Sequence, residues 1–332
     1  MQKSKWFHIV LLCFICTMAC KEPPSEPAPS AMPENAQTNP APTPPVERLG
    51  MEERIEIPIE LQQQLAAAGY MQKDTAPKTV PSDNPYSNVD LAGLMEGTNG
   101  TFVFYDMQRD MRLVHNEARA NTPFSPCSTF KIPHSLIALD TGVASGPGQP
   151  IAWDKQKYPE EPWWDSMLAQ NGLHWDRDHS LATAFANSCV WYYKETAKKI
   201  GADRMKSYLI KFNYGNRDIS SGIDSFWLGG SLKISANAQV DFLHRFLRND
   251  LGLKKKTVID ARQVFEVKRV DNRVLYAKTG GGENIGWYVG FIETPDNQYL
   301  FAFNMPGVFK DTLHTRITKS MAILAELGVW VE

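Results

Sequence analysis

Cysteine is scarce in the body of this 332-residue chain, and this scarcity excludes a disulfide-based scaffold. Three of the five cysteines lie in an apolar N-terminal segment, which leaves only Cys127 and Cys189. The seven histidines lack close partners at metal-ligand spacing, so we expect no protein-built metal site. The net charge of −2 gives no reason to expect a nucleic acid as partner. What remains is 43% hydrophobic and 22% charged, which is typical of a globular protein with one or two domains.

The first twenty residues have the parts of an export signal. Lys3 and Lys5 give a positive start, and the apolar run from Trp6 to Ala19 is shorter than the roughly 20 residues that span a bilayer. Cys20 follows directly, and this ending resembles a bacterial lipoprotein signal, whose cysteine is lipidated and becomes the mature N-terminus. The resemblance implies export to the periplasmic side, with membrane contact only through a lipid anchor at Cys20. An ordinary cleaved signal with an incidental cysteine is the alternative.

Residues 21–88 are predicted to be a disordered tether. Residues 21–50 hold nine prolines with Ser, Ala, Glu and Gln between them, a composition that cannot bury a core. Residues 72–88 are again rich in Pro, Ser, Asp and Asn, and only residues 58–69 are candidates for a short helix. The folded domain is therefore predicted to span residues 89–332.

The folded domain is predicted to have strands towards both ends, with helices between and after them. The hydrophobic patterns predict strands over residues 100–106, 112–115, 274–278, 286–294 and 299–304. They predict helices over residues 128–142, 181–200 with a break near Ser188, 203–212, 235–249 and 312–328. This order indicates an α+β fold with an antiparallel sheet and a separate helical region.

One stretch of the domain combines a potential nucleophile with a potential base. Pro126 suits the start of a helix, and Ser128 and Lys131 stand three residues apart, so on a helix they share a face. A serine hydroxyl becomes an effective nucleophile when a nearby base takes its proton. This spacing alone is expected by chance about once in a chain of this length, so its interpretation depends on other motifs.

Four further motifs follow, namely Ser188-Cys189-Val190, Tyr214-Gly215-Asn216, Trp227-Leu228-Gly229-Gly230 and Lys278-Thr279-Gly280. Together with Ser128-Thr129-Phe130-Lys131 they stand in the order of the class D serine β-lactamases, the oxacillinase group, which residues 90–330 resemble closely. The resemblance implies a serine β-lactamase/penicillin-binding-protein-like fold, with an antiparallel five-stranded sheet flanked by helices and an all-helical lobe. It also implies hydrolysis of small-molecule β-lactam antibiotics in the cleft between sheet and lobe.

The resemblance assigns roles to four side chains. Ser128 would form the acyl-enzyme, and Lys131 would carry CO2 as a carbamate that acts as general base, with no other cofactor. Ser188 would pass a proton to the leaving nitrogen, and Lys278 would supply positive charge beside it. Apolar neighbours would favour the neutral amine that adds CO2.

The resemblance also identifies the supporting groups of the site. The backbone N–H groups of Ser128 and Gly281 match the oxyanion hole of the family. Val190, Trp227 and Leu228 match the residues that surround the carbamate, and the indole N–H of Trp227 would hold it. Tyr214 and Asn216, by contrast, are expected to turn the chain at the edge of the cleft.

The residues expected to bind the substrate are Thr279, Gly280 and Arg316. Arg316 departs from the family pattern, because alignment of the following Ile-Thr-Lys puts His314 where the family has its carboxylate-binding arginine. Two positions on a helix rotate a side chain by about 200°. Arg316 and His314 therefore remain alternatives for this contact.

Cys127 and Cys189 each stand beside a predicted catalytic serine. If Ser128 and Ser188 converge, their neighbours also come close, and exported proteins meet an oxidising compartment. A disulfide beneath the site and two separate buried thiols are the two alternatives.

Two further functions fit the same motifs. A β-lactam-binding sensor domain would be acylated but would release the product very slowly. A penicillin-binding peptidase would use the same Ser128, Lys131 and Lys278 on cell-wall peptides.

We expect the mature chain to begin at a lipid-modified Cys20. Mass spectrometry of the N-terminal peptide from a membrane fraction should show a diacylglycerol adduct on this residue, and Cys20→Ser should release the protein from that fraction. An unmodified N-terminus on either side of Cys20 would support the ordinary cleaved signal.

Overall fold

The structure is a computed structural model that describes residues 84–162, 164, 173–307 and 309–330. The predicted signal, the possible helix at residues 58–69 and most of the tether lie outside these residues. Among the helices of the described part, none is both long and apolar enough to cross a lipid bilayer.

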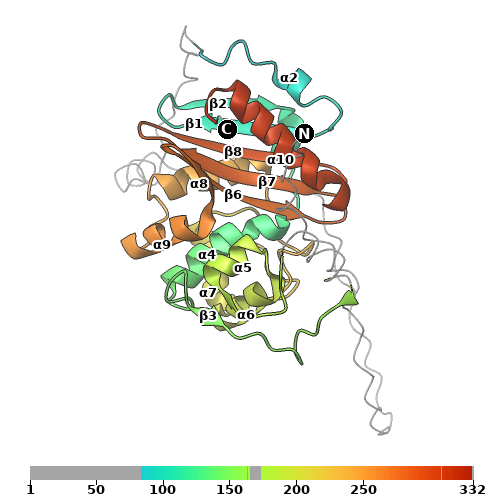
Figure 1. Ribbon diagram of the computed structural model, residues 1–332, viewed down its shortest axis with the longest axis vertical. Helices are drawn as coiled ribbons and strands as arrows, with labels where there is room; N and C mark the ends of the chain where they lie inside the picture. Colours follow the sequence, from blue (N-terminus) through green and yellow to red (C-terminus); the bar gives the residue numbers. More distant parts are fainter. Residues whose placement is uncertain (1–83, 163, 165–172, 308, 331–332) are drawn as a thin grey trace, which may run out of the picture. The chain divides into compact units, whose positions relative to one another are not determined.

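An antiparallel sheet runs through the domain in the order β2-β1-β8-β7-β6-β5, six strands within the described part of the chain (Figure 1). The strands are β1 (Thr101–Asp106), β2 (Met111–His115), β5 (Glu266–Val270), β6 (Arg273–Gly281), β7 (Gly286–Glu293) and β8 (Gln298–Met305). Every residue of β1 is buried, since this strand lies between β2 and β8. Neighbouring strands from β5 to β8 are joined by short turns, which brings the end of β6 close to the start of β7.

The α+β class and the antiparallel sheet are confirmed. The sheet was expected to have five strands, but it has six in the described part of the chain. The missing strand is β5, which follows helix α9 (Lys255–Phe265) directly and forms an edge of the sheet. Its sequence, Glu-Val-Lys-Arg-Val, is mostly exposed and mostly charged, as is common where a strand has a neighbour on only one side. Such a segment lacks the apolar alternation on which the strand prediction depended.

Helices cover both faces of the sheet. Figure 1 shows α10 (Phe309–Glu326) in front of the strands and α8 (Ala236–Leu247) behind them, and both helices contact β7 and β8. Helix α8 begins at Ser235, whose side chain accepts a hydrogen bond from the N–H of Ala238. Its apolar side chains at Val240, Leu243 and Phe246 are buried, as their helical spacing predicts.

A second group of helices forms the helical lobe. Its members are α4 (Lys131–Asp140), α5 (Leu181–Ala186), α6 (Val190–Ile200) and α7 (Ala202–Lys211), with α9 packed against α4 and α5. The predicted break in the segment 181–200 is confirmed, because α5 and α6 are separate helices with Ser188 between them. The remaining short elements are α2 (Leu91–Leu94), α3 (Glu117–Asn121), the 3-10 turn η1 (Cys127–Phe130), β3 (Pro150–Ile151) and β4 (His179–Ser180).

The carboxylate of Asp140 at the end of α4 ties the lobe together. It accepts hydrogen bonds from the Tyr208 hydroxyl of α7 at 2.5 Å, and from the Lys254 N–H and the Thr257 hydroxyl at the start of α9, both at 3.0 Å. Two segments distant in sequence therefore donate to one carboxylate of α4, and this fixes the end of α4 relative to its neighbours.

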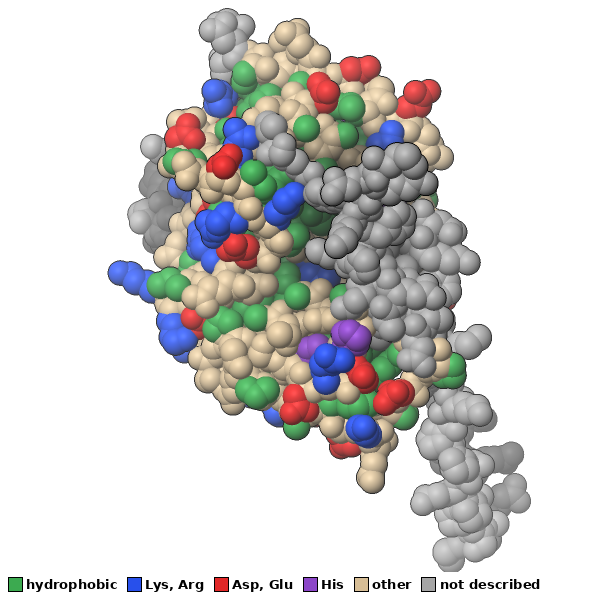
Figure 2. All heavy atoms as spheres, viewed as in Figure 1, with side chains coloured by type: hydrophobic (Ala, Val, Ile, Leu, Met, Phe, Trp, Pro, Cys, Tyr) green, Lys and Arg blue, Asp and Glu red, His purple; other side chains and the backbone are tan. Residues whose placement is uncertain are grey.

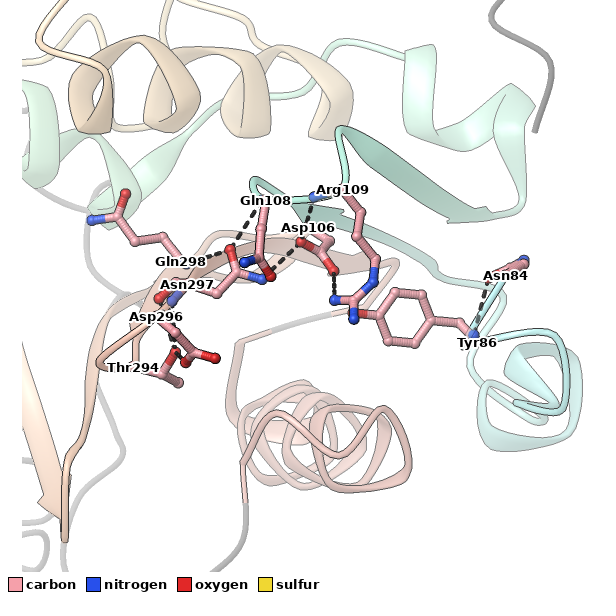
Figure 3. Close-up of polar contacts among 9 residues, drawn as sticks. All are labelled: Asn84, Tyr86, Asp106, Gln108, Arg109, Thr294, Asp296, Asn297 and Gln298. Carbon is pink, nitrogen blue, oxygen red and sulfur yellow. Dashed lines mark hydrogen bonds and ion pairs between the residues drawn. The ribbon is translucent and has the colours of Figure 1, made fainter. Parts of the chain in front are cut away.

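Asp106 has the corresponding role at one end of the sheet (Figure 3). Its fully buried side chain accepts from the backbone N–H of Arg109 at 3.1 Å and from the Arg109 guanidinium at 2.9 Å. It also accepts from the side-chain amide of Asn297 at 2.8 Å, and the oxygen of that amide accepts from the N–H of Gln108 at 3.0 Å. The turn after β1 and the turn before β8 are therefore joined by one polar network.

We expect Asp106→Ala to lower the free energy of unfolding by about 1–3 kcal/mol, because it leaves the buried side-chain amide of Asn297 without its acceptor and removes the hydrogen bonds of the part-exposed Arg109. Urea denaturation with constant m-values measures the change. Asp296→Ala is the control, since this exposed carboxylate accepts from the nearby Thr294 hydroxyl and its loss should change stability by under about 0.5 kcal/mol. Equal losses for the two variants would contradict the role given to Asp106.

Candidate active site

The turn that carries Ser128 lies where the helical lobe meets the sheet. The chain enters it from Phe124, whose backbone exchanges two hydrogen bonds with Ile234, at 2.8 and 2.9 Å. Cys127 then adopts a left-handed backbone conformation with φ of +48°, which is rare for a residue other than glycine. Such strain persists only where the surroundings hold it, and it is common at functional sites.

The predicted pairing of Ser128 and Lys131 is present. Ser128 lies in η1 and Lys131 opens α4, so the two side chains extend from the same face, and Lys131 Nζ lies 2.9 Å from Ser128 Oγ. Both residues are completely buried. An amine at this distance can take the hydroxyl proton directly if it is neutral.

Two titratable neighbours of Lys131 in the lobe, Tyr193 and Cys189, are neutral near pH 7. Lys131 Nζ lies 5.2 Å from the ring centre of Tyr193, and it also interacts electrostatically with Cys189 and His134. Burial raises the pKa of the Tyr193 phenol and the pKa of the Cys189 thiol well above their ordinary values, so neither group supplies a negative charge near neutral pH. This environment disfavours the charged form of a buried amine.

Trp227 is held over the same helix start. Its ring stacks on Phe130 with centroids 5.7 Å apart and meets His134 edge-on at 5.5 Å, so it touches the residues on either side of Lys131. Its indole N–H is buried and has no hydrogen-bond partner among the described residues. A buried donor without a partner is unfavourable by about 1–3 kcal/mol, which indicates that an acceptor belongs beside it.

The other two residues expected to support the carbamate are less deeply placed. Val190, the first residue of α6, and Leu228, directly after Trp227, are half-buried and pack against the main core. They supply apolar surface at the edge of the site, consistent with the expected role.

Ser188 lies in the tight turn between α5 and α6. Its backbone is left-handed, with φ of +52°, and its N–H donates to the Phe185 carbonyl at 3.0 Å. Its hydroxyl is buried and has no hydrogen-bond partner in the described part of the chain. Lys278 Nζ, from β6, lies 5.7 Å from the ring centre of the same Phe185. Lys278 of β6 therefore lies beside the end of α5, the helix that directly precedes the Ser188 turn.

The glycines of β6 bring this strand against the Ser128 turn. A Cβ at Gly280 would lie 2.8 Å from the Pro126 carbonyl oxygen and 3.0 Å from the Thr129 nitrogen, so only glycine permits this approach. Thr279 beside it is half-buried, whereas Gly281 is buried next to the turn. The strand end that carries Lys278 thus runs along the backbone of the predicted nucleophile.

Arg316 is buried against the backbone of β6. It is completely buried, and its Nη1 donates to the Gly280 carbonyl at 2.7 Å. His314, two positions earlier on α10, is exposed and lies near the Thr318 hydroxyl. The guanidinium of Arg316 therefore contacts the backbone of β6 and is closed off from solvent, and the choice between Arg316 and His314 as carboxylate ligand stays a prediction.

Of the two alternatives for the cysteines, a disulfide or two separate thiols, the structure shows two separate thiols. Cys127 and Cys189 are both buried thiols, and they form no disulfide with one another. The Cys127 sulfur lies 3.7 Å from the Ser125 hydroxyl, on the sheet side of the turn, whereas Cys189 lies in the lobe at the N-terminal end of α6.

Sequence reasoning missed Ser125, which links three segments around the site. Its hydroxyl donates to the Trp227 carbonyl and accepts from the Gly229 N–H, both at 3.0 Å. Its own carbonyl accepts from the indole N–H of Trp287 in β7 at 2.9 Å. Its position three residues before Ser128 is the only signal in the sequence, and a single serine in a loop is too common to single out.

A second missed anchor is Gln239 on α8. Its amide donates to the Thr129 hydroxyl at 2.9 Å, and its oxygen accepts from the Tyr214 hydroxyl at 3.2 Å. Asn216 holds the following loop, since its side chain bonds to the Ser231 carbonyl and to the Lys233 N–H. Tyr214 and Asn216 are therefore placed as the predicted structural residues, and Tyr214 supports the nucleophile turn through Gln239.

His134, one turn after Lys131, is a buried titratable group that was also missed. The Thr196 hydroxyl donates to the Tyr193 carbonyl, so it must accept the 3.2 Å hydrogen bond from His134 Nε2–H. Burial is the largest cause that lowers the pKa of His134, to about 3. The imidazole therefore packs as a neutral ring behind the site.

Comparison with known proteins gives consistent findings. Residues 81–326 match the family model described as the penicillin-binding protein transpeptidase domain. The chain is 38% identical over 230 residues to β-lactamase OXA-48 of Klebsiella pneumoniae, which covers 68% of this chain and 82% of that protein. The crystal structure of the class D β-lactamase YbXI from Nostoc is similar with a TM-score of 0.67 and 35% identity, over 73% of this chain and 100% of that one.

A regulatory protein is also among the relatives. The chain is 29% identical over 266 residues to the regulatory protein BlaR1 of Bacillus licheniformis, which covers 78% of this chain but only 42% of BlaR1.

We expect His134 to make the protein less stable in acid. The unfolded imidazole binds a proton below about pH 6.5, whereas the folded one does so only near pH 3, so stability falls as pH drops through this window. The slope from this group approaches about 1.4 kcal/mol per pH unit. Urea denaturation from pH 7.5 to pH 4.5 should give a shallower loss for His134→Asn than for the wild type. The difference in free energy of unfolding between the two proteins at pH 7.5 measures the packing change alone. Parallel plots of this free energy against pH would contradict the low pKa of His134.

Proposed function

The chain belongs to the class D β-lactamases, and from this we propose that it hydrolyses β-lactam antibiotics through an acyl-enzyme on Ser128. The observation that carries the proposal is the buried 2.9 Å contact between Lys131 Nζ and Ser128 Oγ. The class D relatives at 35–38% identity support the same reaction. The substrate is accordingly a small cyclic amide.

The residues present fit a carbamate on Lys131. Complete burial of the amine favours its neutral form, which is the form that reacts with CO2. The buried indole N–H of Trp227, without a partner among the described residues, offers a donor for a carbamate oxygen. When CO2 is bound in this way, it supplies a general base that serves both acylation and deacylation.

In the proposed acylation, Ser128 Oγ gives up its proton to the general base at Lys131 and attacks the β-lactam carbonyl carbon. The C–N bond of the ring then breaks, and the ring nitrogen receives a proton through the Ser188 hydroxyl. The N–H groups of Ser128 and Gly281 would stabilise the oxyanion that forms, a contribution of about 3–4 kcal/mol for each donor. Lys278 would hold Ser188 and the substrate carboxylate by its positive charge.

In the proposed deacylation, water attacks the ester carbonyl and Ser128 leaves with its proton restored. The cycle therefore consumes one water and opens the ring once. Export and lipid attachment at Cys20 remain part of the proposal, and they place this reaction on the periplasmic side of a membrane.

The similarity to BlaR1 favours a sensor domain as the second candidate. The same Ser128 chemistry would then stop at the acyl-enzyme. The two candidates differ only in deacylation, so a turnover measurement separates them.

We expect the purified chain to turn over a chromogenic cephalosporin many times, with activity that rises on addition of bicarbonate. Lys131→Ala should lower kcat/KM by about 10²- to 10⁴-fold, the usual contribution of a general base. Lys255→Ala is the matched control, because this exposed lysine opens α9 away from Ser128.

Trp227→Phe keeps the ring but removes the N–H, so it should raise the bicarbonate concentration needed for half-maximal activity. Full activity in Lys131→Ala, or no dependence on bicarbonate in any variant, would sink the base assignment. One equivalent of chromophore released without further turnover would instead identify the sensor.

A further inference from the structure

We propose that Arg316 is a positioning residue that orients the oxyanion-hole N–H of Gly281 through the peptide bond between Gly280 and Gly281. This inference rests on the proposed function, because it assigns a role within the same acyl-transfer step. It replaces the expectation that Arg316 grips the substrate carboxylate.

The guanidinium reaches β6 from helix α10. Helix α10 approaches β7 closely at Gly286, where a Cβ would lie 2.5 Å from the Thr312 hydroxyl and 2.9 Å from Arg316 Nη1. Gly286 pairs with Gly281 across the ladder, and Trp287 pairs with Gly280. The absence of a side chain at Gly286 therefore opens the path along which Arg316 extends to the neighbouring strand.

Arg316 Nη1 donates a hydrogen bond to the carbonyl oxygen of Gly280, at 2.7 Å. This distance is typical of a charge-assisted hydrogen bond, which is roughly twice as strong as a neutral one. The side chain is completely buried, so water competes little for the same oxygen.

The Gly280 carbonyl and the Gly281 N–H belong to the same peptide unit. A peptide unit is planar, and no described peptide bond is cis, so the C=O and N–H of this unit point in opposite directions. A donor that fixes the direction of the carbonyl therefore fixes the direction of the N–H as well. The same bond polarises the peptide and makes its N–H a stronger donor.

The peptide needs this support because its own residues are glycines. Gly280 and Gly281 have no side chains to restrict φ and ψ, and Gly282 follows them. On the other face, Gly280 packs against Pro126 and Thr129 of the nucleophile turn. The peptide is thus held between Arg316 on one side and the turn on the other.

The contact with the strand also explains why Arg316 does not act as a carboxylate ligand. A donor that already binds a buried backbone oxygen must give up that hydrogen bond, and leave the oxygen unsatisfied, before it can bind a substrate carboxylate. Arg316 has no exposed surface, and its Nη1 already serves the Gly280 carbonyl.

The test is the effect of Arg316→Met and Arg316→Lys on acylation, followed by stopped-flow with a chromogenic cephalosporin and with its carboxylate methyl ester. We expect Arg316→Met to lower the acylation rate constant by about 10- to 100-fold, below the loss for complete removal of an oxyanion donor. The loss should be equal for acid and ester, and the pre-acylation dissociation constant should change by less than about threefold. Arg316→Lys, which keeps a charged donor, should recover part of the rate.

Ser320→Ala is the matched control. It removes another buried polar group of α10, one turn further on, whose hydroxyl bonds only to the Arg316 carbonyl among the described contacts. Its acylation rate should stay within about twofold of the wild type even if its melting temperature falls as far as that of Arg316→Met.

Two results for the variants overturn the inference. A weaker dissociation constant for the acid alone would make Arg316 a carboxylate ligand, and wild-type acylation in both variants would leave it no catalytic role. If Arg316→Met fails to fold, Arg316→Lys decides by its own rate. A wild-type chain that is acylated without turnover would refute hydrolysis but leave this inference standing, whereas no acylation at all would refute both.

Discussion

The close packing of β6 on the Ser128 turn is the constraint on which the rest of the site depends. Gly280 has no room for a Cβ against Pro126 and Thr129, so the backbone of the strand lies directly beside the backbone of the turn. Because the turn also opens α4, the same contact sets the position of Lys131 relative to β6. The sheet and the helical lobe meet there. The lobe side carries Ser128, Lys131 and Ser188, and the sheet carries Lys278.

This arrangement holds unfavourable features that the surroundings must offset. Cys127 and Ser188 have left-handed backbones, which cost of order 1–3 kcal/mol each. The buried indole of Trp227 adds a donor without a partner in the described part of the chain. The hydrogen bonds of Ser125 and Gln239 stabilise the same turn from two directions, so the strained geometry is retained when no substrate is present. Rigidity of this kind is what acyl transfer requires, since oxyanion donors contribute only if they are oriented in advance.

Much of this site could be predicted from sequence because its motifs are local. Ser128 and Lys131 share a helix start, and the break at Ser188 was visible in its surroundings. Contacts between distant segments could not be predicted, as Ser125 meets Trp227 about 100 positions later and Arg316 meets Gly280 across 36. The strand β5 was missed for a different reason, since a charged edge strand has little apolar pattern to detect. The sequence left His314 and Arg316 of α10 as alternatives for the carboxylate contact. In the structure they differ in burial, since Arg316 is buried and His314 is exposed.

The charged edge strand β5 affects how copies of the protein meet one another. Glu266 and Arg269 of β5 form an ion pair at 2.8 Å on the open side of the sheet, and Lys268 lies between them in the sequence. A second copy that added its own strand to this edge would have to strip water from these charges without offering fixed partners. Sheet extension from one copy to the next is therefore unfavourable along β5. If the protein is tethered to a membrane at high surface density, neighbouring copies can collide at this edge and separate again without joining into fibres.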